Sequence, residues 1–389
     1  MINGESLLRR PLRWAQIGGG RGSQVGYIHR SAALRDRTFE LVAGAFDVDP
    51  DRGRDFGLGL GVAGDRCYSD YEALIAGEAR RVDGVEVVSV ATPNHTHFVI
   101  AKACLEAGLH VVCEKPLCFT AAEADQLVVL AKQKNRLLGV TYGYSGYQMI
   151  QEARALVARG ELGDIRIVTM QFAHGFHSTP VEQSNPSTKW RVSPQFAGPT
   201  YVLGDLATHP LFLSETIVPQ LKLKRLLCSR QSFVTSRAPL EDNAFVLMEY
   251  EGGAVGSLWT SAVNAGSTHS QRVRVVGSRA SVEWWDEHPN QLKFEVQGEP
   301  PRLLDRGMEY LVEDALAEDR IGAGHPEGLF EAWSNLYRRF ALAADAHDRG
   351  DAQFLETFWY PDAKAGATGV RWVEKCAESA DKGAVWVDF

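Results

Sequence analysis

Short apolar runs alternate with helix-like segments over the first 140 residues of the chain. The continuous, β-branched character of these runs predicts strands at 13–17, 40–46, 85–91, 109–113 and 137–142, each buried on both faces of a parallel sheet. Helices are predicted at 96–107, which ends at Gly108, and at 120–134, which begins with the capping-box pair Thr120 and Glu123. Alternating strands and helices indicate a doubly wound α/β domain.

The pattern changes near residue 145. After a helix at 150–159 and a strand at 165–172, strands are predicted in close succession at 244–250, 254–263, 272–276, 281–285 and 291–296, with helices at 326–348 and 361–379. This succession predicts an α+β domain with a largely antiparallel sheet. We therefore expect a first domain at residues 1–143 and a second at residues 144–389.

The composition narrows the class of protein. The 389 residues are 45% hydrophobic, and 41 Lys and Arg against 49 Asp and Glu give a net charge of −8, which argues against general nucleic-acid binding. No apolar run approaches the roughly 20 residues that span a bilayer, and the first 14 residues lack the apolar region of a secretory signal. The six cysteines form no CxxC pair, which favours reduced thiols in a cytoplasmic protein.

A glycine run lies between the first strand and a following helix. Glycines there allow a sharp turn and a close approach to a pyrophosphate, which the helix N-terminus would bind. Against the pattern GxGxxG, the third position holds Ser23, and Gly26 can supply the close contact between helix and strand. Taken alone, the run fits a turn without a ligand equally well. The residues expected to contact a cofactor at this turn are Gly18, Gly20, Gly22, Ser23 and Gln24.

Asp47 ends the second predicted strand. An acid at this position suits the ribose hydroxyls of NAD and would repel the 2′-phosphate of NADP. Asp47 also fits a cap for a helix starting near Pro50, and the two interpretations are compatible.

Three further segments carry a family resemblance. The third strand ends in ATPNHTH (91–97), the fourth in CEKPL (113–117), and GDLATH follows at 204–209. Together with the glycine run, these segments resemble the Gfo/Idh/MocA family of NAD(P)-dependent oxidoreductases, which act mostly on sugars and cyclitols. The resemblance covers nearly the whole chain.

The resemblance implies a Rossmann domain joined to an open, mostly antiparallel sheet, with one sheet face at the substrate site and another surface forming dimers or tetramers. It also implies that EKP supplies a catalytic Lys115 and that DxxxH supplies Asp205 and His209. Two positions depart from the family pattern, because Gly198-Pro199 replaces a glycine pair and Phe212 replaces an acidic residue.

The chemistry of these three residues fits the oxidation of a carbinol. That reaction needs a hydride acceptor, a base for the hydroxyl proton and a cation near the oxygen. Lys115 follows a strand at the edge where open α/β sheets bind ligands, and His209 accepts protons near neutral pH. Asp205 would share a face with His209 if the segment is helical. The alternatives are a solvated lysine, a capping aspartate and a core histidine, or a metal pair without a third ligand; we predict no metal.

Other polar residues extend the predicted site. The cofactor side is expected to include Thr92, Pro93, Asn94, His97 and Glu114, together with Asp47 and Lys115. The substrate side is expected to include Tyr144, His174, His177, Trp190, Arg191 and His325, together with Lys115, Asp205 and His209. Turn chemistry, solvated surface or core packing is the alternative for each of these residues when it is taken alone.

Three functions are compatible with this site. The first is an NAD-dependent dehydrogenase of a sugar, sugar derivative or inositol, in which Lys115 and His209 move the proton. The second is a glycoside hydrolase in which NAD oxidises C3 transiently before elimination, hydration and re-reduction, with anionic glycosides such as sulfoquinovosides among its substrates. The third, a regulator that binds NAD without turnover, predicts damaged catalytic positions, and none is seen. We expect NAD as cofactor, a small-molecule substrate and a homodimer or homotetramer, with neither nucleic acid nor membrane as partner.

Overall fold

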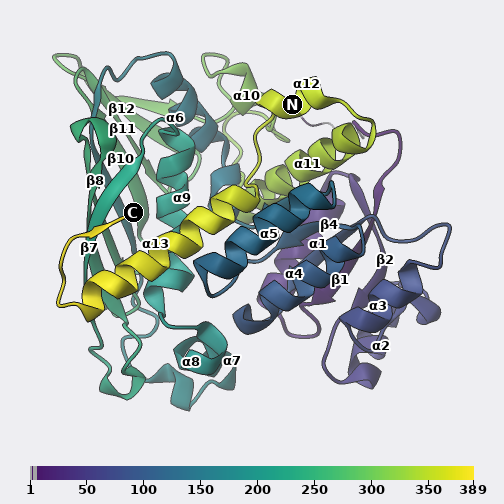
Figure 1. Ribbon diagram of the computed structural model, residues 1–389. Helices are drawn as coiled ribbons and strands as arrows, with labels where there is room; N and C mark the ends of the chain where they lie inside the picture. The colour runs from purple at the N-terminus through teal and green to yellow at the C-terminus, as the bar shows by residue number, and fades with distance from the viewer. Residues whose placement is uncertain (1, 3–6) are drawn as a thin grey trace. The chain divides into compact units, whose positions relative to one another are not determined.

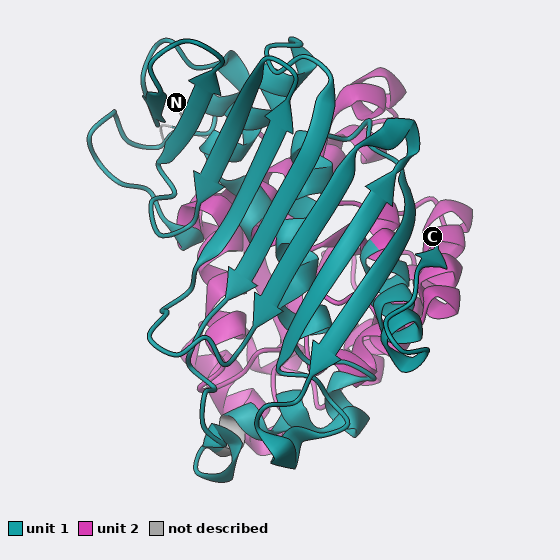
Figure 2. Cartoon of the chain, turned by 90° about the vertical axis from the view of Figure 1, so that its left-hand side faces the viewer, with its two compact units in different colours: residues 1–2, 144–329, 369–389 teal, residues 3–143, 330–368 magenta. Residues whose placement is uncertain are grey.

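The computed structural model describes residue 2 and residues 7–389, apart from the side chains at positions 186 and 187. The chain forms two compact units (Figure 2). Unit 2 contains the described residues of 3–143 together with 330–368, and unit 1 contains residue 2, residues 144–329 and residues 369–389. The expectation that the first 14 residues are no secretory signal falls partly on residues 1 and 3–6, which lie outside the described residues.

Unit 2 is built on a five-stranded sheet in the order β2-β1-β3-β4-β5, and every pair of neighbouring strands is parallel. The strands are β1 (Leu12–Gly18), β2 (Phe39–Ala45), β3 (Val87–Ala91), β4 (His110–Cys113) and β5 (Leu138–Val140). Their apolar side chains are buried on both faces, as Trp14, Val88 and Val111 illustrate. The predicted doubly wound parallel sheet is confirmed.

The helices of this sheet are α1 (Gln24–Arg35), α2 (Pro50–Gly59), α3 (Tyr71–Glu78), α4 (His97–Glu106) and α5 (Ala121–Gln133) (Figure 1). The predicted capping box of α5 is confirmed, because Thr120 Oγ1 accepts from the Glu123 N–H at 3.2 Å and Glu123 Oε2 accepts from the Thr120 N–H at 3.1 Å. The helix expected to start near Pro50 is α2, whereas the sequence pattern did not reveal the short helix α3.

The long helix α11 (Leu329–Asp348) belongs to unit 2 from residue 330 onwards, although we expected this segment in the second domain. Aromatic side chains account for the placement. The ring of Tyr337 lies 6.2 Å from Trp14 of β1 and 5.6 Å from Phe39 of β2, and its hydroxyl bonds Ser89 of β3 at 2.7 Å. Such contacts are long-range and leave no mark on local periodicity. The functional division between two domains at residue 143 stays a prediction.

Unit 1 is built on a nine-stranded sheet in the order β13-β12-β11-β10-β6-β9-β8-β7-β14. All its neighbouring strands are antiparallel except β6 and β9, which confirms the predicted mostly antiparallel sheet. The strands are β6 (Ile165–Ala173), β7 (Leu223–Gln231), β8 (Asn243–Tyr250), β9 (Val255–Ser261), β10 (Gln271–Gly277), β11 (Ala280–Trp285), β12 (Gln291–Val296), β13 (Arg302–Asp305) and β14 (Val387–Asp388). Strand β7 was not predicted, because charged residues interrupt its apolar pattern.

Two helices cover one face of this sheet. Helix α6 (Gln148–Ala158) contacts β11 and β12, and α9 (Thr208–Ile217) contacts β6 and β10. Figure 2 looks onto the opposite face, where no helix of unit 1 lies over the strands. The remaining helices are α7 (Pro186–Lys189), α8 (Pro194–Ala197), α10 (Glu313–Leu316), α12 (Ala352–Thr357) and α13 (Ala363–Asp381).

Two expectations about the chain as a whole can be compared with the structure. Among the described residues, no helix combines the length and apolar character that a membrane span requires. All six cysteines lie in the described part of the chain, and none forms a disulfide there.

Candidate active site

The glycine turn of unit 2 leaves no room for a side chain at Gly18, Gly20 or Gly26, whereas Gly22 faces open space. Gly18 has a φ of +76°, and a Cβ there would lie 2.6 Å from the carbonyl oxygen of Ala91. A Cβ on Gly20 would overlap the Phe46 carbonyl, and one on Gly26 would overlap Gly19. Ser23 caps the following helix α1, since its Oγ accepts from the Gly26 N–H at 3.0 Å. The turn therefore keeps its backbone bare beside a helix N-terminus, which is the cradle that a pyrophosphate needs.

Asp47 follows β2 as an ionised acid. Its Oδ1 accepts from Arg52 Nη2 at 2.7 Å and from the Asp49 N–H at 3.0 Å, and the Arg52 bond is the main cause that lowers the pKa of Asp47. The capping alternative does not apply to it, because Asp49 caps α2 by accepting from the Asp51 and Arg52 N–H groups. Asp47 thus fits the ribose of a dinucleotide, and together with the glycine turn it makes unit 2 suited to NAD.

His97 joins two turns at the ends of neighbouring strands. The side chain is fully buried, with Nδ1 2.8 Å from the Pro116 carbonyl oxygen and Nε2 2.9 Å from the Thr92 carbonyl oxygen. Thr92 and Asn94 lie in the turn after β3, and Pro116 lies in the turn after β4. Any influence of His97 on a bound cofactor therefore runs through these turns.

Glu114 and the half-buried Lys115 follow β4 directly. The Glu114 backbone N–H donates to the Val90 carbonyl at 3.1 Å, which continues the pairing of β3 with β4. Its buried carboxylate accepts from Thr141 Oγ1 at 2.5 Å and lies 3.0 Å from His29 Nε2. The glycine turn, Asp47, the turn after β3 and Lys115 thus all lie at the carboxyl edge of one parallel sheet, where such sheets bind ligands.

Asp205 and His209 belong to unit 1. A π-helical turn (Leu203–Ala207) holds Asp205 and runs into α9, which holds the buried His209, so the segment is helical as the shared-face argument required. The buried Glu241 fixes the start of this turn, because its Oε1 accepts from the Tyr201 N–H at 2.9 Å and from the Leu203 N–H at 3.0 Å. Arg191 Nε lies 3.3 Å from Asp205 Oδ2. π-helical turns occur often at functional sites.

Aromatic and histidine side chains gather around His209. The ring of Tyr144 meets His209 edge-on at 4.9 Å, and Phe172 lies 6.1 Å from His209. His174 and His177 lie 5.6 Å apart, and His177 Nδ1 contacts the Tyr201 hydroxyl. The expected substrate residues Tyr144, His174 and His177 are therefore brought into one cluster of unit 1.

Sequence reasoning missed a series of polar contacts that ends in this cluster. The Tyr144 hydroxyl lies 3.1 Å from His269 Nε2, and His269 Nδ1 contacts the carboxylate of Asp286. His269 also packs 4.5 Å from Phe172. No local motif marks His269 or Asp286: His269 lies just before β10 and Asp286 just after β11, and the two meet Tyr144 only in the folded sheet.

Burial sets the protonation of the cluster. Burial and then the neighbouring His177 lower the pKa of His174 to about 4, and burial followed by Arg237 lowers the pKa of His177. Burial, with Asp286 as the next cause, raises the pKa of Tyr144 well above its usual value. Near neutral pH the side chain of His174 is therefore neutral and can both donate and accept hydrogen bonds.

Trp190 and Arg191 lie next to Asp205, whereas His325 lies elsewhere in unit 1. The Arg191 guanidinium stacks over Trp190 at 4.6 Å while it pairs with Asp205. His325 is exposed, and its carbonyl oxygen accepts from Arg306.

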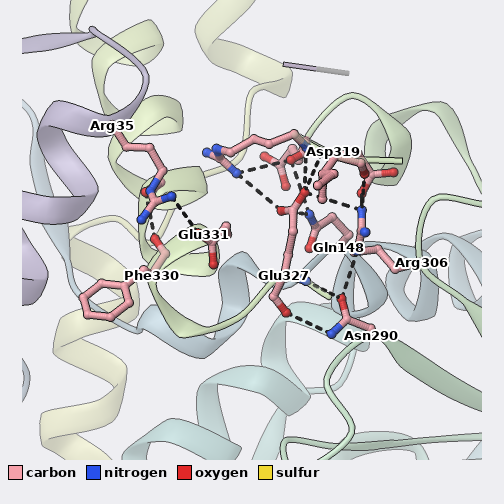
Figure 3. Close-up of polar contacts among 12 residues, drawn as sticks. Arg35, Gln148, Asn290, Arg306, Asp319, Glu327, Phe330 and Glu331 are labelled. Atoms are coloured by element: carbon pink, nitrogen blue, oxygen red, sulfur yellow. Dashed lines mark hydrogen bonds and ion pairs between the residues drawn. The ribbon is translucent and has the colours of Figure 1, made fainter. Parts of the chain in front are cut away.

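Arg306 belongs to a buried polar network in unit 1 (Figure 3). Arg306 donates to Asp319 Oδ1 at 2.7 Å and to Asn290 Oδ1 at 2.9 Å, while Glu327 accepts from Gln148 at 2.8 Å. The network ties the loop before α11 to the end of the sheet. The contacts of His325 are with this network, and its predicted substrate role stays a prediction.

One group of possible metal ligands lies in unit 2. Ligand atoms of His110, His347 and Asp348 lie within 4.8 Å of one another. The Leu137 N–H donates to His110 Nδ1 at 2.9 Å, so the ring proton lies on Nε2 and points at Asp348 Oδ1, 3.1 Å away. A metal ion at Nε2 would have to displace this proton, and we interpret the group as a hydrogen-bonded cluster.

A bare glycine turn, an acid after the next strand and a lysine at the same sheet edge define a dinucleotide-dependent oxidoreductase by class. The family description "Oxidoreductase family, NAD-binding Rossmann fold" matches residues 12–142, and "Oxidoreductase family, C-terminal alpha/beta domain" matches residues 154–389. The chain belongs to the Gfo/Idh/MocA oxidoreductase family. The predicted family, fold class and NAD cofactor are confirmed.

Three relatives match over the full length. The chain is 56% identical to the uncharacterized oxidoreductase YfiI of Bacillus subtilis (strain 168), with 100% of both chains covered. It is similar to the structure of an inositol dehydrogenase homolog from Azotobacter vinelandii complexed with NAD⁺, with a TM-score of 0.99, 67% identity and 100% of both chains covered. It is also similar to the structure of such a homolog complexed with NADH and myo-inositol, with a TM-score of 0.96, 66% identity and the same coverage.

Proposed function

We propose that the protein is an NAD-dependent dehydrogenase that oxidises a secondary carbinol of a cyclitol or sugar, with inositols as its first candidate substrates. One observation carries the proposal: a structure 66% identical over the whole chain is described as an inositol dehydrogenase homolog with NADH and myo-inositol. The chemistry of Lys115, Asp205 and His209 supports it.

Each of the three residues has a distinct role in this proposal. NAD, when bound at the glycine turn, supplies the hydride acceptor. The Lys115 ammonium stabilises the substrate oxygen as negative charge develops on it. The His209 imidazole takes the hydroxyl proton, and Asp205, which is held by Arg191 at 3.3 Å, orients a neighbouring hydroxyl or the imidazole.

The remaining substrate contacts follow from the cluster in unit 1. Tyr144, His174 and His177 are neutral groups that can exchange hydrogen bonds with the hydroxyls of a polyol. Arg191 and Trp190 add a cation and an apolar plane, which suit the edge and face of a cyclitol ring.

We also propose that the protein is cytoplasmic, and its six cysteines without a disulfide support this location.

The proposal is tested by incubating the protein with NAD⁺ and a panel of myo-inositol, other inositol isomers and aldoses while NADH absorbance is recorded. We expect NADH from at least one inositol, and NADH formation slower by a factor of about 10³ in the same mixture with a Lys115→Ala variant. Absence of NADH from every cyclitol and sugar, with NAD⁺ shown to bind, would count against the dehydrogenase.

The hydrolytic alternative uses the same three residues, and no observation favours it over the dehydrogenase. Its stoichiometry distinguishes it when a nitrophenyl glycoside is added to the same panel of substrates. A glycosidase would release the aglycone of a nitrophenyl glycoside without net NADH, whereas the proposed dehydrogenase forms one NADH for each ketone.

A further inference from the structure

A buried series of hydrogen bonds in unit 2 ends on the residue before Lys115. Trp14 Nε1 donates to Ser89 Oγ at 2.8 Å, and Ser89 Oγ lies 2.7 Å from the Tyr337 hydroxyl. That hydroxyl contacts His29 Nδ1, and His29 Nε2 lies 3.0 Å from Glu114 Oε1. Trp14, Ser89 and His29 are fully buried, while Tyr337 is 2% and Glu114 8% exposed.

The two ends set the direction of the series. The Trp14 indole N–H can only donate, and an ionised carboxylate can only accept. If Ser89 donates to Tyr337, Tyr337 to His29 Nδ1, and His29 Nε2–H to Glu114, every polar hydrogen in the series has an acceptor. This arrangement uses a neutral His29 protonated at Nε2. The reverse direction needs an imidazolium and leaves the Ser89 hydroxyl hydrogen without an acceptor within the series.

Glu114 is ionised despite its burial. Burial raises the pKa of the Glu114 carboxyl, but the His29 bond and the nearby Lys115 and Thr141 outweigh it, so the net pKa is lowered. The titratable groups that act on this carboxylate or feel its charge are His29, Lys115, His97, Cys113 and Tyr337. Of these groups, His29 lies within hydrogen-bond distance of the carboxylate, at 3.0 Å.

We propose that His29 and Tyr337 are positioning residues of the oxidoreductase: through a neutral imidazole they hold the Glu114 carboxylate ionised and fixed, and thereby place the adjoining Lys115. This inference rests on the catalytic role proposed for Lys115. It also assigns a function to α11, which carries Tyr337 under the parallel sheet although it follows the second sheet in the sequence.

Packing alone would not require these groups. Apolar side chains of similar size would fill the same volume without removing these polar groups from water, and removal from water costs free energy wherever a partner is lacking. A fully paired buried series rigidifies the groups at its ends. Here one end is an indole of the core, and the other end is the carboxylate adjoining Lys115.

The first test reads the tautomer of His29 and needs no substrate. The full-length protein is labelled with ¹⁵N-histidine, and the His29 resonances are assigned from the spectrum of a His29→Gln variant, which lacks them. We expect the neutral Nε2–H tautomer at pH 7, and a shift of the Nδ1 resonance in Tyr337→Phe. Tyr68→Phe is the matched control, because it removes a tyrosine hydroxyl that donates to Glu78 in the same unit, and it should leave His29 unchanged. An imidazolium or an Nδ1–H tautomer would overturn the proposal.

The second test measures turnover of myo-inositol with NAD⁺. His29→Leu removes both hydrogen bonds, whereas the amide of His29→Gln can still accept from Tyr337 and donate to Glu114. We expect kcat to fall about tenfold in His29→Leu. The acid limb of the pH profile of kcat should also move up by about one pH unit, because the Glu114 carboxylate loses the His29 hydrogen-bond donor. His29→Gln should stay within about threefold of the wild type, with an unmoved limb.

The outcomes of the two tests separate the two proposals. Equal losses in the Leu and Gln variants, or an unmoved acid limb in His29→Leu, would reduce His29 to a structural role and overturn the inference. If the wild type oxidises no cyclitol or sugar, the proposed function fails, while the tautomer measurement still decides the direction of the series.

Discussion

At the scale of single residues, removal of the Lys115 side chain is expected to lower turnover while NAD⁺ still binds. It follows β4 at the ligand-binding edge of the sheet, while the glycine turn follows β1 and Asp47 follows β2. Lys115→Ala should therefore lower kcat by a factor of about 10³, since a cation at the reacting oxygen is lost, and leave the Kd of NAD⁺ within about threefold. Steady-state kinetics and a fluorescence titration measure the two quantities. Unchanged turnover would remove Lys115 from the mechanism.

Asp47 and Arg52 together are expected to set the choice between NAD and NADP. Arg52 is exposed and pairs with Asp47 at 2.7 Å, so removal of the carboxylate frees a guanidinium beside the position of the ribose. Asp47→Ser should raise the ratio of kcat/KM for NADP⁺ over NAD⁺ at least about tenfold, because a repulsive charge is lost and a phosphate ligand is released. The double variant Asp47→Ser/Arg52→Ala is the control and should lose most of this gain. If the single variant still rejects NADP⁺, another group sets the choice.

The sequence predicted the position of a site residue where that residue belongs to a local motif at the end of a strand. The glycine turn, Asp47 and the Glu114–Lys115 pair all follow strand ends, and the parallel order of the strands brings them to one edge. The partners of these residues could not be found in the same way. His29 and Tyr337 are separated by 308 positions, and Tyr144 and His269 by 125, so that only the folded units bring each pair together.

At the scale of elements, periodicity located most strands and the long helices, but missed several irregular or short elements. The π-helical turn Leu203–Ala207 contains no local signal of its wider winding, and β7 and α3 were hidden by charge and short length. Local pattern could not place α11, since its Tyr337 packs against Trp14 of β1, which lies 323 positions earlier in the chain (337 − 14).

The π-helical turn that presents Asp205 depends on a buried carboxyl. Burial raises the pKa of Glu241 to about 7, against the opposing effect of the Leu203 and Tyr201 N–H groups. The folded state therefore binds a proton that the unfolded chain, with an ordinary pKa near 4.5, has already released. This proton adds roughly 3 kcal/mol to the free energy of unfolding below about pH 4.5, and the contribution is lost as the pH rises to about 7.

Glu241→Gln tests this linkage, because the amide keeps an acceptor oxygen and cannot ionise. The free energy of unfolding of the wild type, measured by urea titration at pH 5 and pH 8, should fall more over this interval than that of the variant. Glu241→Ala is the control: it removes the acceptor as well, and should destabilise the protein at both pH values. Parallel pH profiles of the wild type and Glu241→Gln would contradict the assignment.

At the scale of the whole molecule, the chain builds its two units out of sequence order. It completes five parallel strands, forms most of the second sheet, returns to unit 2 with residues 330–368 and ends in unit 1 from residue 369 onwards. The return supplies Tyr337 to the series that ends on Glu114. Local order of elements therefore predicts the two sheets, while the composition of each unit follows from long-range packing.

The helix-free face of the nine-stranded sheet is expected to be covered by a second copy of the chain. Phe245, Leu247, Val255 and Ile167 lie on this face of the neighbouring strands β8, β9 and β6, with exposures of 52%, 48%, 45% and 41%. Arg274, which pairs with Glu283 and Glu295, continues the face on β10. A broad apolar strip beside charges of both signs is self-complementary, so two copies can pack through it about a two-fold axis. The family resemblance implies such association into dimers or tetramers.

Light scattering coupled to size exclusion should therefore give the mass of a dimer or tetramer for the wild type, and a lower mass for Phe245→Glu combined with Leu247→Lys. The substitutions bury a charge wherever the two copies meet, so association should weaken at least about a hundredfold. Val129→Glu is the matched control, since Val129 is 53% exposed on α5 of the other unit. A monomeric wild type, or an unchanged mass for the sheet variant with native circular dichroism, would show that this face is not where copies of the chain associate.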